Sequence, residues 1–268
     1  MTLQDKHNQL RAQIGAMPGA LVAFSGGVDS TLVLAVAHAE LGERALAVTG
    51  RSPSVPEREL NASRDLAAHI GAEHVILDTA EIHSPDYTAN PANRCYFCKS
   101  ELYGHLKRVA AERRIPYILN GTNTDDLGDH RPGLVAADEA QVISPLSDSG
   151  LSKQDVRDLS QQLGLPTWDK PAMACLASRV PYGQEVTREK LGMIEQAEDF
   201  LIGLGFRQLR VRHHGDVARI EVPQDDLPML LDPQQARRIE TRFRELGFQY
   251  VTVDILGFRS GSLNEVLR

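Results

Sequence analysis

The stretch "ALVAFSGGVDSTLVLAVAHAEL", residues 20–41, constrains the fold more than any other part of the chain. A short apolar run ends in two glycines, and apolar residues then recur at helical spacing, which predicts a strand, a tight turn and a helix. Two more strands are predicted at 44–50 and 73–79, with a helix at 56–71 between them. This alternation indicates an α/β fold, a parallel sheet with helices on both faces.

The pattern changes along the rest of the chain. Helices are predicted at 98–114 and 152–166, where Ser152 is a good N-cap, and a strand enters a polar loop within 115–126. From Thr187 onward the predicted elements are a helix at 187–204, strands at 207–214 and 217–223, a helix at 233–246 and a strand at 249–256. We therefore expect a main domain at 1–166, a cysteine-bearing linker loop at 167–186 and a small C-terminal α/β domain at 187–268.

Composition limits the classes of protein to which the chain can belong. Its 268 residues, 42% of them hydrophobic, are enough for a full core. The formal net charge of −7 provides no overall positive field, which argues against a protein that grips nucleic acid. Neither a signal segment nor an apolar run of about 20 residues is present, so we expect a cytoplasmic protein without a membrane partner.

The glycine turn predicts an anion-binding site. After a strand and before a helix, the backbone N–H groups of Gly26, Gly27 and Val28 form a concave site at the positive end of the helix dipole. The hydroxyl groups of Ser25, Ser30 and Thr31 add further donors. The turn is not a Walker A motif, because the Gly-Lys pair of that motif is missing from the sequence.

Asp29 is unusual inside such a turn. A carboxylate repels phosphates unless a cation lies between them, so Asp29 suggests a bridging Mg²⁺ ion. The alternative is that Asp29 only stabilises the start of the helix. Two further polar positions follow strand ends, where ligands bind in open α/β sheets: Arg51 after the second strand, and Asp125 in "GTNTDD". A capping turn is the competing interpretation for Asp125.

The chain has three cysteines, an odd number. Cys95 and Cys98 have metal-ligand spacing in "CYFC", and Cys175 stands alone in "PAMACLASRVPYG". Zinc would need a fourth ligand, for which the candidates are His105, His130 and His213. Three thiolates better fit a [4Fe–4S] cluster with one iron open to an exogenous ligand such as hydrosulfide. An ordinary buried role for Cys175 is the remaining alternative.

The strand "FRQLRVRHHG", residues 206–215, alternates in polarity. Arg210 and Arg212 share one face and Leu209 and Val211 the other, so we expect two guanidinium groups to project from one surface. Guanidinium groups suit bidentate contacts with phosphate. The competing interpretation is a solvated edge strand whose charges prevent aggregation.

Five ordered segments resemble a known family: "SGGVDST", "RSPSVPERE", "NRCYFCK", "GTNTDDLGDHRPG" and "MACLASRVPYG". The first resembles the PP-loop ATP pyrophosphatases, and together they resemble the LarE-type ATP-dependent sulfur transferases over nearly the whole chain. That resemblance implies a PP-loop fold, adenylylation by ATP of pyridinium-3,5-biscarboxylic acid mononucleotide, and replacement of carboxylate oxygen by sulfur in nickel-pincer nucleotide cofactor biosynthesis. Members with one cysteine sacrifice it, whereas this chain is similar to three-cysteine members with a [4Fe–4S] cluster that presents sulfide.

The resemblance also implies roles for particular residues. It places ATP at residues 25–31, Arg51, Gly121 and Asp125, with Mg²⁺ on Asp29. It implies catalytic roles for Asp29 and Cys175, an iron–sulfur cluster on Cys95, Cys98 and Cys175, and a substrate phosphate at Arg179, Arg210 and Arg212. The expected partners are a small mononucleotide substrate, a sulfide donor and further copies of the chain.

Three other functions stay open on the sequence. A tRNA-thiolating enzyme would use the same adenylylation and a three-cysteine cluster, but the acidic composition disfavours it. An amide-forming ligase that uses ammonia needs no cysteine, and a zinc-stabilised nucleotide-binding protein would release no pyrophosphate.

Overall fold

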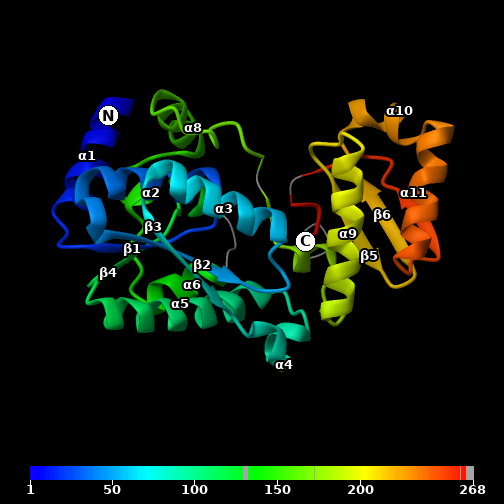
Figure 1. Ribbon diagram of the computed structural model, residues 1–268, viewed down its shortest axis with the longest axis horizontal. Coiled ribbons are helices and arrows are strands. Elements are labelled where there is room, and N and C mark those ends of the chain that lie inside the picture. Colours follow the sequence, from blue (N-terminus) through cyan, green and yellow to red (C-terminus); the bar gives the residue numbers. More distant parts are fainter. Residues whose placement is uncertain (129–131, 172, 260, 264–268) are drawn as a thin grey trace. The chain divides into compact units, whose positions relative to one another are not determined.

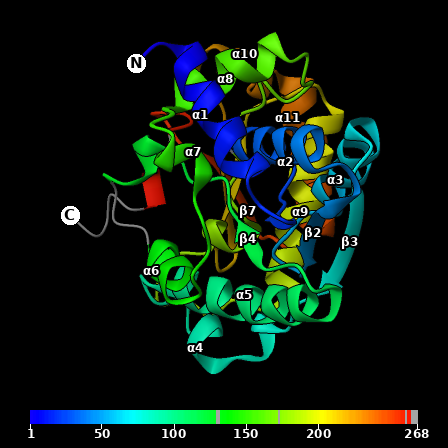
Figure 2. The ribbon, with the colours of Figure 1, turned by 90° about the vertical axis from the view of Figure 1, so that its left-hand side faces the viewer.

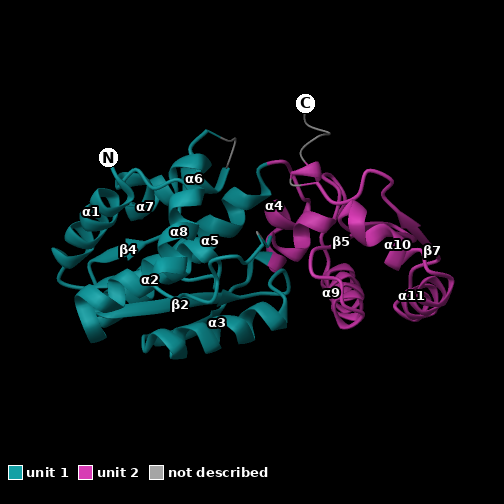
Figure 3. Ribbon diagram, turned by 90° about the horizontal axis from the view of Figure 1, so that it is seen from above, with its two compact units in different colours: residues 1–81, 93–173 teal, residues 82–92, 174–268 magenta. Residues whose placement is uncertain are grey.

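The computed structural model describes residues 1–128, 132–171, 173–259 and 261–263. These residues form two compact units, one of residues 1–81 and 93–173 and the other of residues 82–92 and 174–268 (Figure 3). The sequence does not predict that residues 82–92 join the second unit. The assignment of an ATP-binding domain to 1–166 and a substrate domain to 187–268 stays a prediction. No helix among the described residues has the length and apolar character needed to span a membrane.

The first unit contains a four-stranded parallel sheet with the strand order β3-β2-β1-β4. Its strands are β1 (Ala20–Ala23), β2 (Ala45–Arg51), β3 (Glu73–Asp78) and β4 (Tyr117–Leu119). In the register of the sheet, Val22 of β1 lies between Ala47 of β2 and Leu119 of β4. This confirms the α/β class and the parallel sheet that the alternating pattern predicts.

Helices cover both faces of this sheet (Figure 1). One face carries α1 (Leu3–Gly15), α2 (Val28–Leu41), α3 (Glu57–Ile70) and α8 (Lys153–Gln162), whereas α5 (Arg94–Arg113) and α6 (Pro132–Glu139) lie on the other (Figure 2). Successive residues of β1 serve the two faces: Val22 joins the core under α2, and Leu21 joins the core over α5. A short helix, α7 (Pro145–Asp148), precedes α8.

The starts of two helices test the sequence analysis directly. Ser152 caps α8 as predicted, because its side chain accepts a hydrogen bond from Asp155 N in a capping box. Helix α5, however, begins at Arg94 rather than at residue 98, so the predicted start is wrong by one turn. Asn93 is the N-cap of α5, a position that favours asparagine, although its side chain makes no capping hydrogen bond. Cys95 and Cys98 therefore both lie in the first turns of α5, three residues apart on one face.

The second unit contains a three-stranded sheet in the order β5-β6-β7. Strands β5 (Arg210–His214) and β6 (Val217–Glu221) are antiparallel, and β7 (Tyr250–Val253) runs parallel to β6. Its helices are α4 (Pro85–Thr88), α9 (Arg188–Gly203), α10 (Leu227–Leu230) and α11 (Pro233–Glu245). Val211 pairs with Ile220 on the face that packs with Leu201 of α9 and Phe243 of α11.

Asn90 ties the inserted segment 82–92 into the second unit. The side chain is fully buried, and its Nδ2 atom donates to the carbonyl groups of Val180, Pro181 and Gln184 at 3.2, 2.7 and 3.0 Å. The backbone has a φ of 55°, in the left-handed region that asparagine tolerates better than most residues. Asn90 O also accepts a hydrogen bond from Gly183 N at 3.0 Å.

Removal of the Asn90 amide should destabilise the protein. Asn90→Ala leaves buried carbonyl groups without their donor and strains the left-handed backbone, and we expect a loss of about 2–4 kcal/mol in the free energy of unfolding. Asn90→Gly removes only the amide, because glycine accepts this φ without strain. Urea denaturation followed by circular dichroism measures both variants. A loss below about 0.5 kcal/mol in Asn90→Gly, the size of an ordinary surface change, would show that the amide stabilises nothing.

Candidate active site

The strand order defines where a ligand can bind in the first unit. Strands β2 and β3 lie on one side of β1 and β4 lies on the other, so the connectivity reverses between β1 and β4. In open parallel sheets, ligands bind outside the carboxyl ends of the strands at such a switch point. The glycine turn at residues 25–27 follows β1, and the loop at 120–126 follows β4. The candidate site therefore consists of these two segments and the start of α2.

The glycine turn has the geometry of an anion site. Gly26 has a φ of +68°, and a Cβ atom there would lie 3.3 Å from Cβ of Ser63 in α3, so only glycine fits without strain. Gly27 is the N-cap of α2, and Ser30 Oγ accepts a hydrogen bond from Ser25 N at 3.2 Å. Thr31 is fully buried in α2, and its Oγ1 has no hydrogen-bond partner among the described residues. The backbone N–H groups at the start of α2 thus provide the positive end of a helix.

Asp29 is held by two side chains from other elements. Lys153 Nζ, from the start of α8, lies 2.5 Å from Oδ2 of Asp29. Asn123 Nδ2, from the loop after β4, donates to Oδ1 at 3.0 Å. The backbone of Gly121 lies close to the same turn: a Cβ atom on Gly121 would lie only 2.8 Å from Ser30 N. The loops after β1 and β4 therefore meet at the switch point, as ligand binding there requires.

The carboxylates of the loop after β4 make capping contacts. Asn123 Oδ1 accepts from Asp125 N at 3.0 Å, and Asp126 Oδ2 accepts from Asn123 N at 3.1 Å, around the short 3₁₀ turn Thr124–Asp126. Asp125 Oδ2 also accepts from Lys153 N at 3.0 Å, which links this loop to α8. These are the contacts expected if Asp125 lies in a capping turn. A direct contact of Asp125 with a nucleotide stays a prediction.

A second lysine, Lys170, holds the glycine turn from another side. Its Nζ atom donates to the Gly26 carbonyl at 3.1 Å and lies 2.7 Å from Oε2 of Glu59 in α3. Arg157 of α8 fixes this part of the chain, because it donates to the carbonyl groups of Trp168 and Lys170 at 2.6 and 2.9 Å. Because the C=O and N–H of a trans peptide point in opposite directions, the contact to Gly26 O also orients Gly27 N–H.

Lys153 and Lys170 are not among the site residues predicted from the sequence. Their partners are distant in the sequence: Lys153 and Asp29 are separated by 124 residues, and Lys170 and Glu59 by 111. One local signal was available for Lys153, which stands directly after an N-cap. A cation at the start of a helix opposes the helix dipole and needs a compensating anion.

Arg51 lies at the carboxyl end of β2 and forms a bidentate ion pair with Asp78 at the end of β3, at 2.6 and 2.8 Å. The hydrogen bonds from Arg51 hold the pKa of Asp78 below its ordinary value. Both side chains are largely exposed, so the pair contributes little to stability. A role of Arg51 at the nucleotide stays a prediction.

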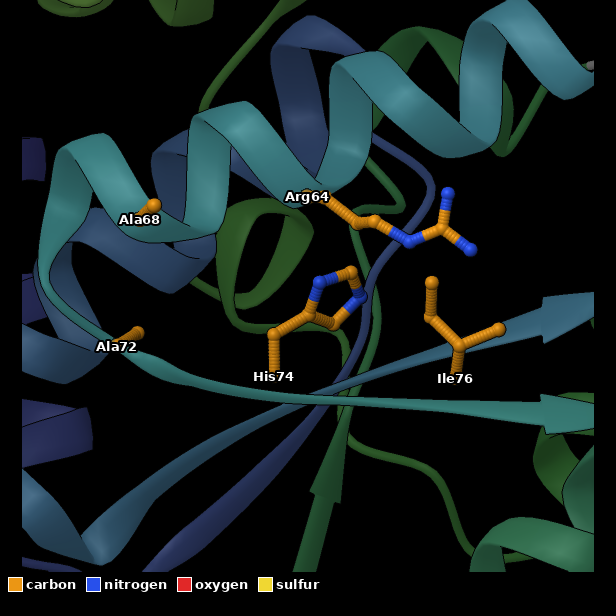
Figure 4. Close-up of a pocket in the computed structure, with 5 residues that line it drawn as sticks. All are labelled: Arg64, Ala68, Ala72, His74 and Ile76. Carbon is orange, nitrogen blue, oxygen red and sulfur yellow. The ribbon is translucent and has the colours of Figure 1, made fainter.

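A pocket of about 430 Å³ lies elsewhere, between α3 and the amino half of β3 (Figure 4). His74, its central polar residue, lies 2.8 Å from Thr49 Oγ1, which donates to the Phe24 carbonyl at 2.6 Å. Since the only hydroxyl hydrogen of Thr49 serves Phe24, Nε2 of His74 is the donor to Thr49. None of the residues that line the pocket belongs to the loops after β1 and β4, so the pocket is not part of the candidate site. His74 and Thr49 instead hold the Phe24 carbonyl, just before the glycine turn.

The cysteines lie in the two units. Cys95 is exposed and Cys98 half-buried on α5, and Cys175 precedes the 3₁₀ turn Leu176–Arg179 of the second unit. All three are thiols rather than disulfides. Within the described part of the chain, no group of three or more His, Cys, Asp or Glu side chains is arranged as a metal site. The [4Fe–4S] assignment therefore stays a prediction.

The histidines considered as zinc ligands have other surroundings. His105 lies 3.4 Å from Glu101 and 2.9 Å from Arg108 on the same helix. The ring of His213 packs against Phe248 with 5.3 Å between ring centroids. His130 lies outside the described residues.

Three arginines form a buried cluster in the second unit. Arg179 is fully buried and pairs with Glu198 of α9 at 2.9 and 3.2 Å. Arg212 pairs with Glu221 of β6 at 3.0 and 2.8 Å and donates to the Ser178 carbonyl at 2.7 Å. Arg210 lies over the ring of Phe258, 4.9 Å from its centroid.

The strand register confirms that Arg210 and Arg212 share a face, but the expectation that they project from the surface is wrong. Only 7% of Arg210 and 6% of Arg212 are exposed, because the turn at Ser178 and residues near Phe258 cover this face. Burial, and next the charge of Arg179, lower the pKa of Arg210 to about 10. Arg179 and Arg212 are each paired with a glutamate, so Arg210 has both positive and negative neighbours.

Substitution of Gly121 tests the contact between the loop and α2. The methyl group of Gly121→Ala would lie 2.8 Å from Ser30 N, and we expect a loss of about 1–3 kcal/mol in the free energy of unfolding through overpacking. Gly104→Ala is the matched control, because a Cβ atom there, inside α5, meets nothing within 4 Å. It should stabilise the protein by up to about 1 kcal/mol. Equal effects of the two changes in urea denaturation would contradict the close contact.

His74 should make the protein sensitive to acid. Burial lowers the pKa of His74 below the ordinary 6.5, so the unfolded chain binds the proton more readily than the folded one. Its contribution to stability is complete above pH 6.5 and is lost as the pH falls through 6.5 toward the folded pKa. His74→Gln keeps a donor for Thr49 but does not titrate. Between about pH 8 and about pH 5.5, the urea midpoint should fall less in His74→Gln than in the wild type. Equal falls would overturn this assignment.

Comparison with known proteins places these features in a family. The family model of Queuosine biosynthesis protein QueC matches residues 19–94, which include the glycine turn. An uncharacterized protein of Synechocystis sp. is 47% identical over 265 residues, covering 99% of both chains. Pyridinium-3,5-bisthiocarboxylic acid mononucleotide synthase of Lactiplantibacillus plantarum is 38% identical over 268 residues, covering 99% of this chain and 96% of the synthase. A subunit of the glutamine-hydrolyzing GMP synthase of Archaeoglobus fulgidus is 27% identical over 194 residues, covering 66% of this chain and 62% of that subunit.

The extent of these similarities distinguishes between them. The similarity to the GMP synthase covers about two thirds of this chain, whereas the similarity to the mononucleotide synthase extends over both units. The glycine turn at the β1/β4 switch point is the feature expected of a PP-loop protein. The chain belongs to the LarE family of ATP-dependent, sulfur-transferring PP-loop enzymes, which includes the synthase of Lactiplantibacillus plantarum.

Proposed function

We propose that this enzyme converts pyridinium-3,5-biscarboxylic acid mononucleotide to its thiocarboxylic form, with ATP as the activating substrate, in nickel-pincer nucleotide cofactor biosynthesis. The observation that carries the proposal is the full-length similarity to a synthase whose name states that product. The anion-binding turn at the switch point of the sheet supports it independently.

The glycine turn would bind the phosphates of ATP. Backbone N–H groups at Gly26, Gly27 and Val28 stand at the start of α2, where the helix dipole favours negative charge. Arg51 ends β2, and Gly121 and Asp125 follow β4. These two strands flank β1, and the three residues complete the proposed nucleotide site at the same edge of the sheet. Asp29 fits Mg²⁺, since a carboxylate among bound phosphates suits a hard cation. When bound, Mg²⁺ would neutralise charge on the phosphates.

The proposed chemistry has two displacements. A carboxylate oxygen of the substrate attacks the α-phosphorus of ATP, the bond to the β-phosphate breaks, and pyrophosphate leaves. A sulfur nucleophile then attacks the acyl carbon, the carbon–oxygen bond breaks, and AMP leaves with the former carboxylate oxygen. The turn contributes by holding the phosphates in place and by stabilising the charge that accumulates on pyrophosphate.

Three thiols supply the sulfur chemistry. Cys95, Cys98 and Cys175 are all reduced, and their number fits a [4Fe–4S] cluster with three protein ligands. When bound, such a cluster would present a sulfide obtained from a donor. The alternative is that Cys175 itself attacks the acyl carbon, after which loss of its Hα proton and cleavage of its Cβ–Sγ bond leave dehydroalanine. The cluster, the sulfide donor and self-association of the chain stay predictions.

The arginine cluster of the second unit is the proposed site for the phosphate of the mononucleotide. Arg179 and Arg212 already pair with Glu198 and Glu221, so their guanidinium groups are fixed in place. Burial, and next the charge of Arg179, lower the pKa of Arg210, and a bound phosphate would stabilise its charged form. Guanidinium groups suit bidentate recognition of phosphate, and a phosphate at Arg179 or Arg212 would have to replace contacts that these groups now make with Glu198 and Glu221.

Release of pyrophosphate tests the function. Protein purified without oxygen should release pyrophosphate from ATP only when pyridinium-3,5-biscarboxylic acid mononucleotide is present. Mass spectrometry should show the substrate gaining the mass difference between sulfur and oxygen. Asp29→Asn should lower kcat/KM by about 100-fold or more, since one preorganised electrostatic contact contributes about that factor.

Cysteine variants separate the competing functions. Cys95→Ala, Cys98→Ala and Cys175→Ala should each abolish sulfur transfer, and iron with acid-labile sulfide should be lost from all three if a cluster is present. Unchanged turnover of the triple variant with ammonia would instead identify an amide-forming ligase. Tight, salt-sensitive tRNA binding with thiolation of the RNA would identify a tRNA-modifying enzyme.

A further inference from the structure

The ion pair between Asp29 and Lys153 lies at the centre of the glycine-turn site. Asp29 is the second residue of α2 and Lys153 the first residue of α8, and the ammonium lies 2.5 Å from the carboxylate. The side chains are 32% exposed for Lys153 and 23% for Asp29, so the pair is half-buried and the lysine can reach solvent.

The position of Lys153 is unfavourable by itself. At the first position of α8 its ammonium stands at the positive end of that helix, and its partner Asp29 lies in the first turn of α2. A cation near a helix N-terminus is destabilised by the helix dipole. The carboxylate of Asp29 offsets this cost, so the two charges stabilise each other.

Both oxygens of Asp29 are occupied. Asn123 donates to Oδ1 and Lys153 lies on Oδ2. The two partners differ in how firmly they are held. Asn123 is 2% exposed and fixed in a capping box, whereas the ammonium of Lys153 stands at the end of a long, partly exposed side chain. A cation that approaches Oδ2 of Asp29 therefore meets the ammonium of Lys153, the more exposed of the two partners.

Among the described residues, Asp29 does not belong to a group of side chains that could hold a metal ion by themselves. No group of three or more metal-ligating side chains exists among the described residues, whereas Mg²⁺ prefers six oxygen ligands in octahedral geometry. The remaining ligands must come from water and from the phosphates of a nucleotide.

We propose that Lys153 is the counter-ion of Asp29 in the nucleotide-free protein and keeps this carboxylate from binding a divalent cation until a nucleotide brings the metal with it. This inference rests on the proposed function only in taking a metal-bound nucleoside triphosphate as the ligand. Its consequence is that metal and nucleotide enter the glycine-turn site together.

Binding of Mn²⁺, a paramagnetic substitute for Mg²⁺, tests the inference without any turnover. Electron paramagnetic resonance of free Mn²⁺ measures the affinity of the nucleotide-free protein. Lys153→Met removes the ammonium and keeps the apolar stem, and we expect its Mn²⁺ affinity to rise about tenfold or more over that of the wild type. The double variant Lys153→Met with Asp29→Asn should lose this gain, because the freed carboxylate is then absent.

Lys6→Met is the matched control. Lys6 of α1 lies 2.6 Å from Asp155, which is in α8 like Lys153, and the two side chains are 21% and 22% exposed. This pair lies outside the glycine turn. Lys6→Met should leave Mn²⁺ affinity unchanged, and thermal denaturation of every variant confirms folding. Equal Mn²⁺ affinity of Lys153→Met and the wild type would overturn the proposal, as would a gain that persists in the double variant. A wild type that releases no pyrophosphate would instead contradict the proposed function and leave the Mn²⁺ result standing.

Discussion

The close approach of the loop after β4 to the first turn of α2 determines the arrangement of the whole candidate site. Gly121 permits it, because any side chain there would collide with the backbone at Ser30. Asn123 then bridges Asp29 and the short turn at Asp125, whose carboxylate receives the first N–H of α8. One steric constraint at a glycine thus brings three segments of the first unit to the carboxyl edge of its sheet, where the strand order reverses.

The second unit is organised by buried charge. The pairs Arg179–Glu198 and Arg212–Glu221 lie almost entirely out of contact with solvent. Pairs of this kind carry a large desolvation penalty, so they are weak sources of stability. Glu198 also accepts a hydrogen bond from Val211 N at 3.1 Å, which connects α9 to strand β5. The two ion pairs instead fix the orientation of the guanidinium groups of Arg179 and Arg212.

Local signals in the sequence predict the helices and strands of this fold well. They predict poorly which distant segments pack against those elements. The strand, turn and helix at 20–41 and the Ser152 cap follow from apolar spacing and capping chemistry, and both are confirmed. Alternation along β5 correctly predicts which residues share a face, but it carries no information about the distant segments that cover that face. The ion pair of Lys153 with Asp29 joins residues 124 positions apart, and a local pattern does not encode such a partner.

The inserted segment 82–92 is synthesised long before the rest of the second unit. Its residue Asn90 donates to carbonyl groups that are 90, 91 and 94 positions further along the chain. Chains emerge from the ribosome amino end first, and domains tend to fold as they become complete. All of the first unit has therefore been synthesised before the acceptors of Asn90 exist. The second unit cannot be completed until then, although its segment 82–92 is made early. A fragment that begins at residue 174 would lack this piece and would leave those carbonyl groups without their donor.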